Sequence, residues 1–223
     1  MATAIRLMDA EGLDALSMRR IADELGTGAA SLYWHVGSKD GLLDLVFDEL
    51  IGEVTIPDPD PPHWREQVKQ VARAQRAGIF RHPYVVRISI GRIPMGPNAL
   101  RYSERTLAIL RAGGLPQRLA VRGSHLLIAA VNGFTLDETG VGGIGLDSSV
   151  ADATSATAAD AERVAAHSAA AAAASSYLAS LPPERFPNLV ALAPEFGYPD
   201  RDEQFELLID IFVDGLARLA KAG

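Results

Sequence analysis

Residues 17–52 read SMRRIADELGTGAASLYWHVGSKDGLLDLVFDELIG, and this stretch decides the fold. Its pattern describes two short helices that meet at Gly26, followed by a longer amphipathic helix. The small side chain of Ala22 allows two backbones to approach, and Gly26 permits a left-handed turn that a bulkier residue resists. Ser17 and Ser38 are favourable N-caps for the first and third of these helices. The stretch therefore predicts two helices that cross at a steep angle, a pattern that an ordinary helical corner shares.

The segment AASLYWH, residues 29–35, is the second of the short helices. It is too short to be a stable helix by itself, and it is aromatic and polar for a core helix. Leu32 is expected to point inward, which leaves hydroxyl, imidazole and aromatic groups on the other faces. Such groups suit the major groove of DNA, where they meet base edges and phosphates.

Residues 19–44, RRIADELGTGAASLYWHVGSKDGLLD, closely resemble the helix-turn-helix of TetR-type transcriptional regulators. The run LYWHV, followed by a lysine and LLD, is similar to the tetracycline-repressor branch of that family. This resemblance implies an all-α fold with a three-helix N-terminal DNA-binding domain and a larger helical ligand-binding and dimerisation domain. It also implies a ligand-responsive regulator, most often a repressor, that binds a palindromic operator as a homodimer and is released by a small-molecule inducer.

The same resemblance implies which residues contact DNA. Two alanines stand where the tetracycline repressor has larger base-reading residues, so each offers only a methyl contact, for example to thymine. We therefore expect sparse direct readout, with half-site centres about one helical turn or a small multiple apart. Partial burial of Trp34 and a plain surface role for His35 remain alternatives. The implied DNA-contacting residues are Ser17, Arg19, Ala29, Ser31, Tyr33, Trp34, His35 and Lys39.

The charge balance argues mildly against nucleic acid. The chain has a formal net charge of −7, and residues 1–50 contain four basic residues against nine acidic ones. A basic-patch criterion for nucleic-acid binding therefore fails. Binding has to rely on Arg19, Arg20 and Lys39 near phosphates and on backbone amides at helix N-termini, so we expect a modest salt dependence.

Length and composition describe a soluble globular chain. With 223 residues, 48% of them hydrophobic, and a mean hydropathy of +0.09, the chain can bury a core in one large or two small domains. No run of 18 uncharged apolar residues and no signal-like start is visible, so no membrane span or export is expected. The absence of cysteine excludes disulfides and thiolate metal sites and fits a cytoplasmic protein.

The rest of the chain is expected to be helical. Residues 2–12 and 39–53 have helical spacing, and the proline-rich run at 56–62 marks a border near residue 54. This predicts a helix-turn-helix domain over 1–54 and a helical ligand-binding and dimerisation domain over 55–223. The β-branched run YVVRISI has no second strand-like run to pair with, so it is expected to be a short helix. We also predict a glycine- and serine-containing loop over 140–155 and an alanine-rich helix over 156–180.

Two helices, at 116–138 and 202–221, carry apolar residues on more than one side. A helix of this kind is buried from more than one direction. Central core helices of a monomer and a four-helix bundle shared between two subunits both fit the pattern. The resemblance favours the bundle, because regulators of this family form homodimers through these helices.

The resemblance also implies a ligand pocket enclosed by residues 62–138. The tetracycline repressor uses histidine there to bind a magnesium–drug complex, whereas the matched positions here, Thr55 and Ser89, have no imidazole. We therefore expect no metal and no cofactor. Arg87, Arg92 and Arg105 favour a carboxylate-bearing ligand held by guanidinium groups, unless they form surface ion pairs. The predicted pocket residues are Val71, Gln75, Ser89, Arg92, Arg105, His125, Asn132 and Phe134.

Nothing in the sequence indicates an enzyme. Serine-hydrolase, P-loop and HExxH zinc motifs are absent, and so is a paired-carboxylate arrangement. GVGGIG at 140–145 follows a helix rather than a strand, so it is interpreted as a linker and not as a nucleotide loop. The alternative to a DNA-binding regulator is a helical small-molecule-binding or interaction module without specific DNA binding.

Overall fold

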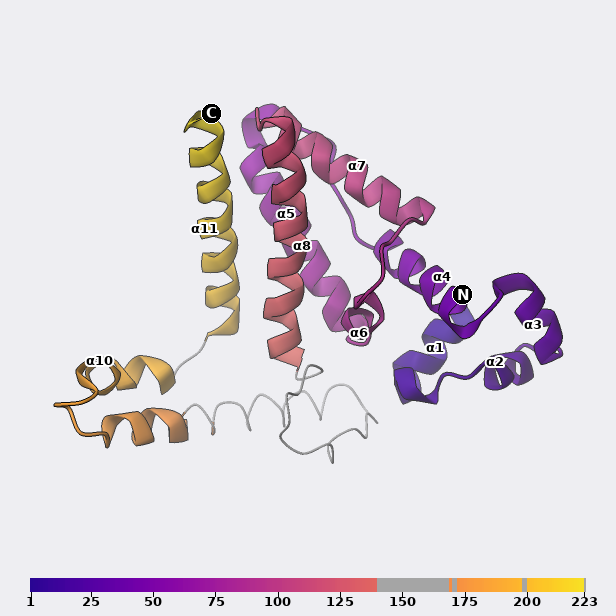
Figure 1. Cartoon of the computed structure of the whole chain (residues 1–223), viewed down its shortest axis with the longest axis horizontal. Coiled ribbons are helices and arrows are strands. Elements are labelled where there is room, and N and C mark those ends of the chain that lie inside the picture. Colours follow the sequence, from indigo (N-terminus) through magenta and orange to yellow (C-terminus); the bar gives the residue numbers. More distant parts are fainter. Residues whose placement is uncertain (140–168, 170–171, 198–199, 223) are drawn as a thin grey trace. The chain divides into compact units, whose positions relative to one another are not determined.

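The computed structural model describes residues 1–139, 169, 172–197 and 200–222 (Figure 1). Every regular element among these residues is an α-helix or a short 3₁₀-helix, which confirms the predicted all-α class. The chain divides into two compact units, and each is described by itself. The larger unit comprises residues 1–150 and 208–223, and the smaller one residues 151–207. The predicted functional border near residue 54 falls inside the larger unit and stays a prediction.

The N-terminal part of the larger unit is a group of short helices around one core (Figure 1). Leu7, Ile21 and Leu42 are among its almost fully buried members. Gly26 adopts a φ of 63°, the left-handed turn that the sequence predicts between the two short helices. The elements are α1 (Ala2–Glu11), η1 (Leu13–Ala15), α2 (Met18–Glu24), α3 (Ala29–Val36) and α4 (Lys39–Gly52).

Both predicted serine caps are present. The Ser17 hydroxyl accepts a hydrogen bond from the backbone N–H of Arg20 at 3.2 Å, at the start of α2. The Ser38 hydroxyl accepts from the N–H of Gly41 at 2.9 Å, at the start of α4. Each cap satisfies one of the amides that a helix N-terminus leaves without an intrahelical partner, so both helix starts are fixed locally.

The rest of the larger unit is a set of longer helices. The apolar run at 84–90 is helical, as predicted, and forms α6 (Val85–Ser89). Val86 and Ile88 of this helix are buried against other helices. Val71, Ile109 and Leu127 come from three different helices of this set and are almost fully buried. The elements are η2 (Pro61–His63), α5 (Trp64–Arg81), α6 (Val85–Ser89), α7 (Pro97–Ala112) and α8 (Gln117–Thr139).

The corner between α5 and α6 is tied to α1. The phenol of Tyr84 donates to the carboxylate of Asp9 at 2.8 Å, and His82 Nδ1 lies 2.7 Å from the same carboxylate oxygen. Burial and this contact with Asp9 raise the pKa of Tyr84 far above its ordinary value. Ile88 belongs to the same hydrophobic core as the N-terminal helices. The N-terminal helices are therefore packed directly on α6.

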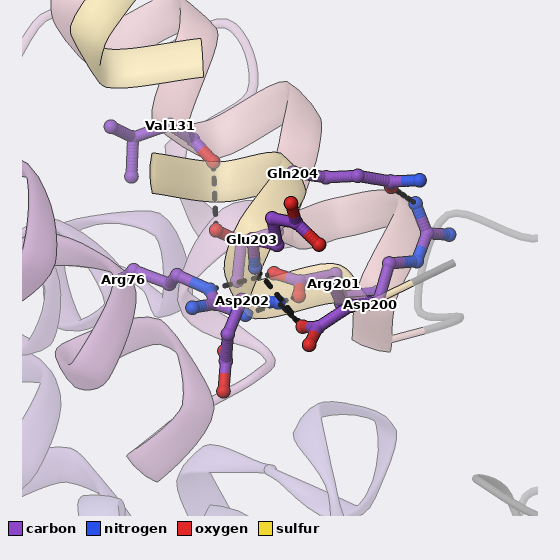
Figure 2. A network of polar contacts seen from close by, with 9 residues as sticks. Arg76, Val131, Asp200, Arg201, Asp202, Glu203 and Gln204 are labelled. Atoms are coloured by element: carbon purple, nitrogen blue, oxygen red, sulfur yellow. Dashed lines mark hydrogen bonds and ion pairs between the residues drawn. The ribbon is translucent and has the colours of Figure 1, made fainter. Parts of the chain in front are cut away.

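The final helix is α11 (Arg201–Ala222). Figure 2 shows its start, where the Asp200 carboxylate accepts from the backbone amides of Asp202 and Glu203 at 3.0 Å each. This is the capping that helix N-termini favour. In the larger unit, α11 pairs Asp210 with Lys69 of α5, and Leu216 lies close to Gly123 of α8.

The smaller unit contains a helix over 172–179, α10 (Pro187–Ala191), η3 (Ala193–Gly197) and the first residues of α11. The loop predicted over 140–155 lies outside the described residues, and so does most of the alanine-rich helix predicted over 156–180. Its described end, residues 172–179, is helical.

Among the described helices, α8 is long and apolar enough to cross a membrane by length and composition alone. Core helices of soluble proteins pass the same test. Leu127 and Val131 of α8 are almost completely buried among the other helices of the larger unit, whereas Val121 and Leu126 of the same helix are exposed.

Candidate nucleic-acid interface and ligand cavity

The α3 helix has no buried residue. Its inner side is formed by Leu32 and Val36, which pack on the N-terminal core as half-buried residues. Its outer side carries Tyr33, Trp34 and His35, with Tyr33 47% and Trp34 82% exposed. The Trp34 and His35 rings contact edge to face with centroids 4.8 Å apart. Of the two alternatives for Trp34, the structure therefore shows the outward one, and α3 displays aromatic and polar groups to solvent.

The predicted phosphate contacts flank α3. The α2 helix begins beside exposed Ser17 and carries Arg19, whose side chain is 89% exposed and lies 4.0 Å from Asp23. Lys39 is exposed at the first position of α4, and Ser31 is exposed on α3, whereas Ala29 is half-buried. The structure thus places all the predicted DNA-contacting residues on α2, α3, their caps or the start of α4.

Ion pairs neutralise several of the N-terminal acidic residues. Arg6 binds Glu24 at 2.7 Å, and Arg87 of α6 binds Asp14 at 3.1 Å. The Arg87 guanidinium holds the pKa of the Asp14 carboxyl below its usual value. Arg20, which we expected near phosphates, forms an ion pair with Glu11. That leaves Arg19 and Lys39 as the basic side chains beside α3, since Arg20 is used within the fold.

A small cavity of about 70 Å³ lies where the end of α4 meets α7. Arg105 is the member of the predicted ligand set that lines it. The other wall residues could not be predicted, because each looks like an ordinary position of an amphipathic helix or of the proline-rich connector. The lining residues are Ile51, Val54, Ile56, Asn98, Arg101, Tyr102 and Arg105.

A polar cluster lies next to this cavity. The Tyr102 phenol donates to Gln75 Oε1 at 2.9 Å, and Gln75 Nε2 donates to Asn132 Oδ1 at 2.8 Å. Burial raises the pKa of Tyr102 well above its ordinary value, so the phenol remains a neutral donor. Val71, one turn before Gln75 on α5, is fully buried. The structure therefore brings Gln75 and Asn132 together, as members of one network with the wall residue Tyr102.

Other predicted pocket residues lie elsewhere. Ser89 donates to the carbonyl of Val86 at 2.7 Å, at the end of α6. Arg92 binds Asp40 of α4 at 2.8 Å, because the chain after α6 runs along α4. His125 is exposed on α8, and Phe134 lies 5.9 Å from the guanidinium of Arg76. None of these four lines the described cavity.

The three arginines that suggested an anionic ligand all have carboxylate partners. Arg87 pairs with Asp14, Arg92 with Asp40 and Asp44, and Arg105 with Asp58. The alternative of ion-paired arginines is therefore the one that the structure shows. Arg105 still contributes to the cavity wall, where Arg101 also lies.

Two family models match the chain. The model for bacterial regulatory proteins of the tetR family matches residues 1–46, and that for the tetracyclin repressor-like C-terminal domain matches residues 56–220. The chain belongs to the TetR family. The helix-turn-helix of this TetR-family protein is thus formed by α2 and α3.

Curated relatives of this TetR-family protein are regulators. It is 41% identical over 111 residues to an HTH-type transcriptional regulator of Saccharopolyspora erythraea, with 50% of this chain and 47% of that protein covered. It is 40% identical over 117 residues to the HTH-type transcriptional repressor DrrR1 of Streptomyces coeruleorubidus, with 50% and 42% covered. The chain thus spans about half the length of the curated relatives it matches.

Solved structures extend the similarity to nearly the whole chain. Apo ActR from Streptomyces coelicolor has a TM-score of 0.83 at 42% identity, with 99% of this chain and 94% of ActR covered. ActR in complex with actinorhodin has a TM-score of 0.81 at the same identity, with 98% and 95% covered. The fold is therefore that of the TetR family protein ActR.

Proposed function

We propose that the chain is a ligand-responsive transcriptional repressor, and not an enzyme, that binds a palindromic operator as a homodimer in the cytoplasm. One observation carries the proposal. The helix α3 has no buried residue, and it displays Tyr33, Trp34 and His35 outward from a helix-turn-helix. A core helix would bury such aromatics, whereas a recognition helix presents them to base edges and phosphates. The curated relatives, a regulator and a repressor, support the same function.

In this proposal the residues around α3 divide into two groups. Ser17, Arg19 and Lys39 contact phosphates and set the register of the protein on the duplex. Ser31, Tyr33 and His35 face base edges, with Trp34 in edge-to-face contact with His35 and Ala29 offering a methyl group. Because the N-cap of α3, Gly28, forms no side-chain cap hydrogen bond, the first amides of α3 are suited to a phosphate. Residues 1–54 act as the DNA-binding domain, and α4 connects it to the rest.

Homodimerisation is supported by apolar side chains that α8 and α11 leave exposed. Leu126 of α8 is 59% exposed, and Ile211 of α11 is 64% exposed. Val121 and Leu219 add further exposed aliphatic surface on the same two helices. Exposed aliphatic strips of this kind mark protein–protein contact sites. We propose that the two helices of each subunit form a four-helix bundle, so that His125 of α8 lies at the subunit contact.

The inducer is proposed to be an organic molecule similar to actinorhodin, which is bound in one of the solved ActR complexes. The cavity wall supplies aliphatic side chains and two arginines, which suit an apolar body with an acidic group. In this proposal the molecule enters beside Arg105 and extends toward Gln75 and Asn132. Val71 lies behind that network.

Gel-shift titration tests the regulator function directly. The full chain is titrated onto the DNA upstream of its own gene and onto an unrelated duplex of equal length, at physiological salt. We expect a Kd about a thousandfold or more lower than for the unrelated duplex, and release of the DNA by actinorhodin. Footprinting of the bound DNA should show a symmetric protected site. Equal binding to both duplexes contradicts specific DNA binding.

The acidic N-terminal part favours one alternative, a helical sensor without specific DNA binding. Residues 1–50 carry an excess of five negative charges, which opposes the phosphate backbone. A chain that forms a dimer and binds actinorhodin, but shifts no duplex, would be such a sensor.

A further inference from the structure

Asp48 lies in the middle of α4, and it is a buried carboxylate with only 9% of the residue exposed. It accepts hydrogen bonds from the backbone amides of Ala99 at 2.9 Å and Asn98 at 3.2 Å. These amides belong to the first turn of α7, whose own N-cap residue, Gly96, provides no side-chain cap. A carboxylate is the preferred group at this end of a helix, because the amides and the helix dipole both stabilise negative charge. Asp48 therefore caps α7 from another helix, about fifty residues earlier in the chain.

Two glycines show how closely α4 and α7 approach. A Cβ added at Gly96 would overlap the carboxylate of Asp48. A Cβ added at Gly52, one turn further along α4, would lie 2.9 Å from the side chain of Asn98. Because there is no space between the two helices at these positions, the first turn of α7 cannot move toward α4 without displacing it.

The same part of α7 forms the cavity wall. Asn98, Arg101 and Tyr102 line the cavity from α7, and Ile51 lines it from α4. Its volume of about 70 Å³ is far below the roughly 300–1,000 Å³ of small-molecule sites. An organic ligand can therefore enter only if these walls separate, and the wall on α7 begins at Asn98, in the turn that Asp48 caps.

A second connection between α7 and α4 is weaker. Arg92, in the segment before α7, binds Asp40 and Asp44, which lie two turns and one turn before Asp48 on α4, respectively. Both of these carboxylates are largely exposed, and exposed ion pairs contribute little. The buried contact at Asp48 is therefore the stiff link, and the pair at Asp44 provides a matched control on the same helix.

We propose that Asp48 is the positioning residue through which ligand entry at the cavity reorients α4 and, with it, the recognition helix. Ligand entry moves the first turn of α7, and the carboxylate of Asp48 transmits that movement because it is bound to two amides of the turn. This inference rests on the proposed function, since it assigns a route to the ligand response.

Because the chain has no cysteine, a thiol-reactive label can attach only to a cysteine that is introduced. Thr27→Cys places one spin label per subunit in the exposed turn before α3, and electron–electron double resonance measures the distance between the two labels of the dimer. Three variants are compared in this background: Asp48→Asn, Gly96→Ala and the control Asp44→Asn. Operator affinity is measured for each, with and without 100 µM actinorhodin as the probe.

Asp48→Asn keeps the shape but loses the charge of the cap. We expect a broader label distance distribution, ligand-free operator affinity within about threefold of the parent, and at least a fivefold smaller loss of affinity on adding actinorhodin. Asp44→Asn is expected to match the parent in label distance distribution, in ligand-free operator affinity and in the response to actinorhodin. An Asp48→Asn chain with the parental distance distribution and the parental response to actinorhodin overturns the proposal.

Gly96→Ala acts from the other helix. Its Cβ pushes the first turn of α7 away from Asp48, so it should mimic the ligand: a shifted label distance and at least a tenfold weaker operator affinity without actinorhodin, in a chain that remains folded by circular dichroism. Parental affinity and label distance in this variant overturn the proposal.

Failure of the proposed function has a different outcome. In that case the parent chain itself forms no dimer or binds no operator, and the inference falls with it. If the parent binds operator but does not respond to actinorhodin, the proposed ligand is wrong, and the label distances of Asp48→Asn and Gly96→Ala still decide the role of Asp48.

Discussion

Two of the regions that expose large apolar side chains differ in chemistry. The α3 helix exposes Tyr33 and Trp34, which combine a ring with a polar atom and lie beside His35 and Lys39. The α8 and α11 helices expose purely aliphatic side chains, of which Leu126 and Ile211 are the clearest cases. An amphipathic ring tolerates water and finds partners on DNA, whereas an exposed leucine gains only by contact with another apolar surface. This difference supports the two partners proposed above, DNA at α3 and a second subunit at α8 and α11.

The largest effect is expected from charge on the aliphatic surface. The double variant Leu126→Glu/Ile211→Glu should be monomeric by light scattering, because buried like charges replace apolar contact. Its operator affinity should fall by roughly 10² or more, since two linked half-site contacts become one. Ile93→Glu alters an aliphatic residue that is 85% exposed outside these helices, and it should remain dimeric. A double variant that stays dimeric would contradict a subunit contact at α8 and α11.

Removal of the polar rings should have the next largest effect. Tyr33→Ala and His35→Ala should each weaken operator binding by roughly 5- to 150-fold, because a good base contact contributes about 1–3 kcal/mol. Fluorescence anisotropy with labelled operator measures the change, and analytical ultracentrifugation should show unchanged dimers. Tyr177→Ala alters an aromatic residue that is 66% exposed outside α3, and it should bind as the parent does. Equal losses in all three variants would mean that α3 has no special role.

The turn that presents α3 allows a smaller test. Gly26→Ala places a Cβ at a φ of 63°, which costs about 1–2 kcal/mol of unfolding free energy. Gly28→Ala lies in the same loop at a φ of −76°, where alanine is not strained, so it should cost only the difference between glycine and alanine as N-caps, roughly 0.5 kcal/mol. Urea denaturation gives both values. If the two variants are equally stable, the left-handed turn does not hold α3 in place.

The smallest effect is expected for the pH dependence of stability that comes from Tyr102, a buried residue of α7. Burial raises the pKa of Tyr102, so the folded chain keeps this proton at pH values where the unfolded chain loses it. Above about pH 10 the unfolded state therefore binds fewer protons, and stability falls as the pH rises. At pH 10.5 the loss from this group is below about 1 kcal/mol. The difference in melting temperature between the parent and Tyr102→Phe should narrow from pH 7 to pH 10.5, whereas a constant difference would contradict this account.

The sequence predicted local structure well because its signals are local. Ser17 and Ser38 cap helices within their own segment, and Gly26 determines its own turn. The outward direction of Tyr33 follows from helical periodicity together with the inward position of Leu32. The helical nature of the run at 84–90 was predicted differently, from the lack of a second strand-like run anywhere in the chain.

The residues around the cavity and their partners could not be predicted in the same way. The partners of Arg87, Arg92 and Arg105 lie between 47 and 73 residues away along the chain, and no local pattern encodes such pairs. Asp48 is one of three acidic residues at four-residue spacing on α4, and only the arrival of α7 distinguishes it from Asp40 and Asp44. Tyr102 likewise resembles any aromatic residue of an amphipathic helix until Gln75 and the cavity are seen beside it.

The most direct test of the account is a titration of the full chain onto two duplexes. One duplex carries the symmetric protected site, and the other has one half of that site scrambled at constant composition. The account predicts that one dimer binds the intact site and that the scrambled duplex binds at least a hundredfold more weakly, with the loss reproduced by Tyr33→Ala/His35→Ala on the intact site. Equal affinity for both duplexes, or no effect of the α3 variant, would contradict the claim that two outward-facing α3 helices read the operator.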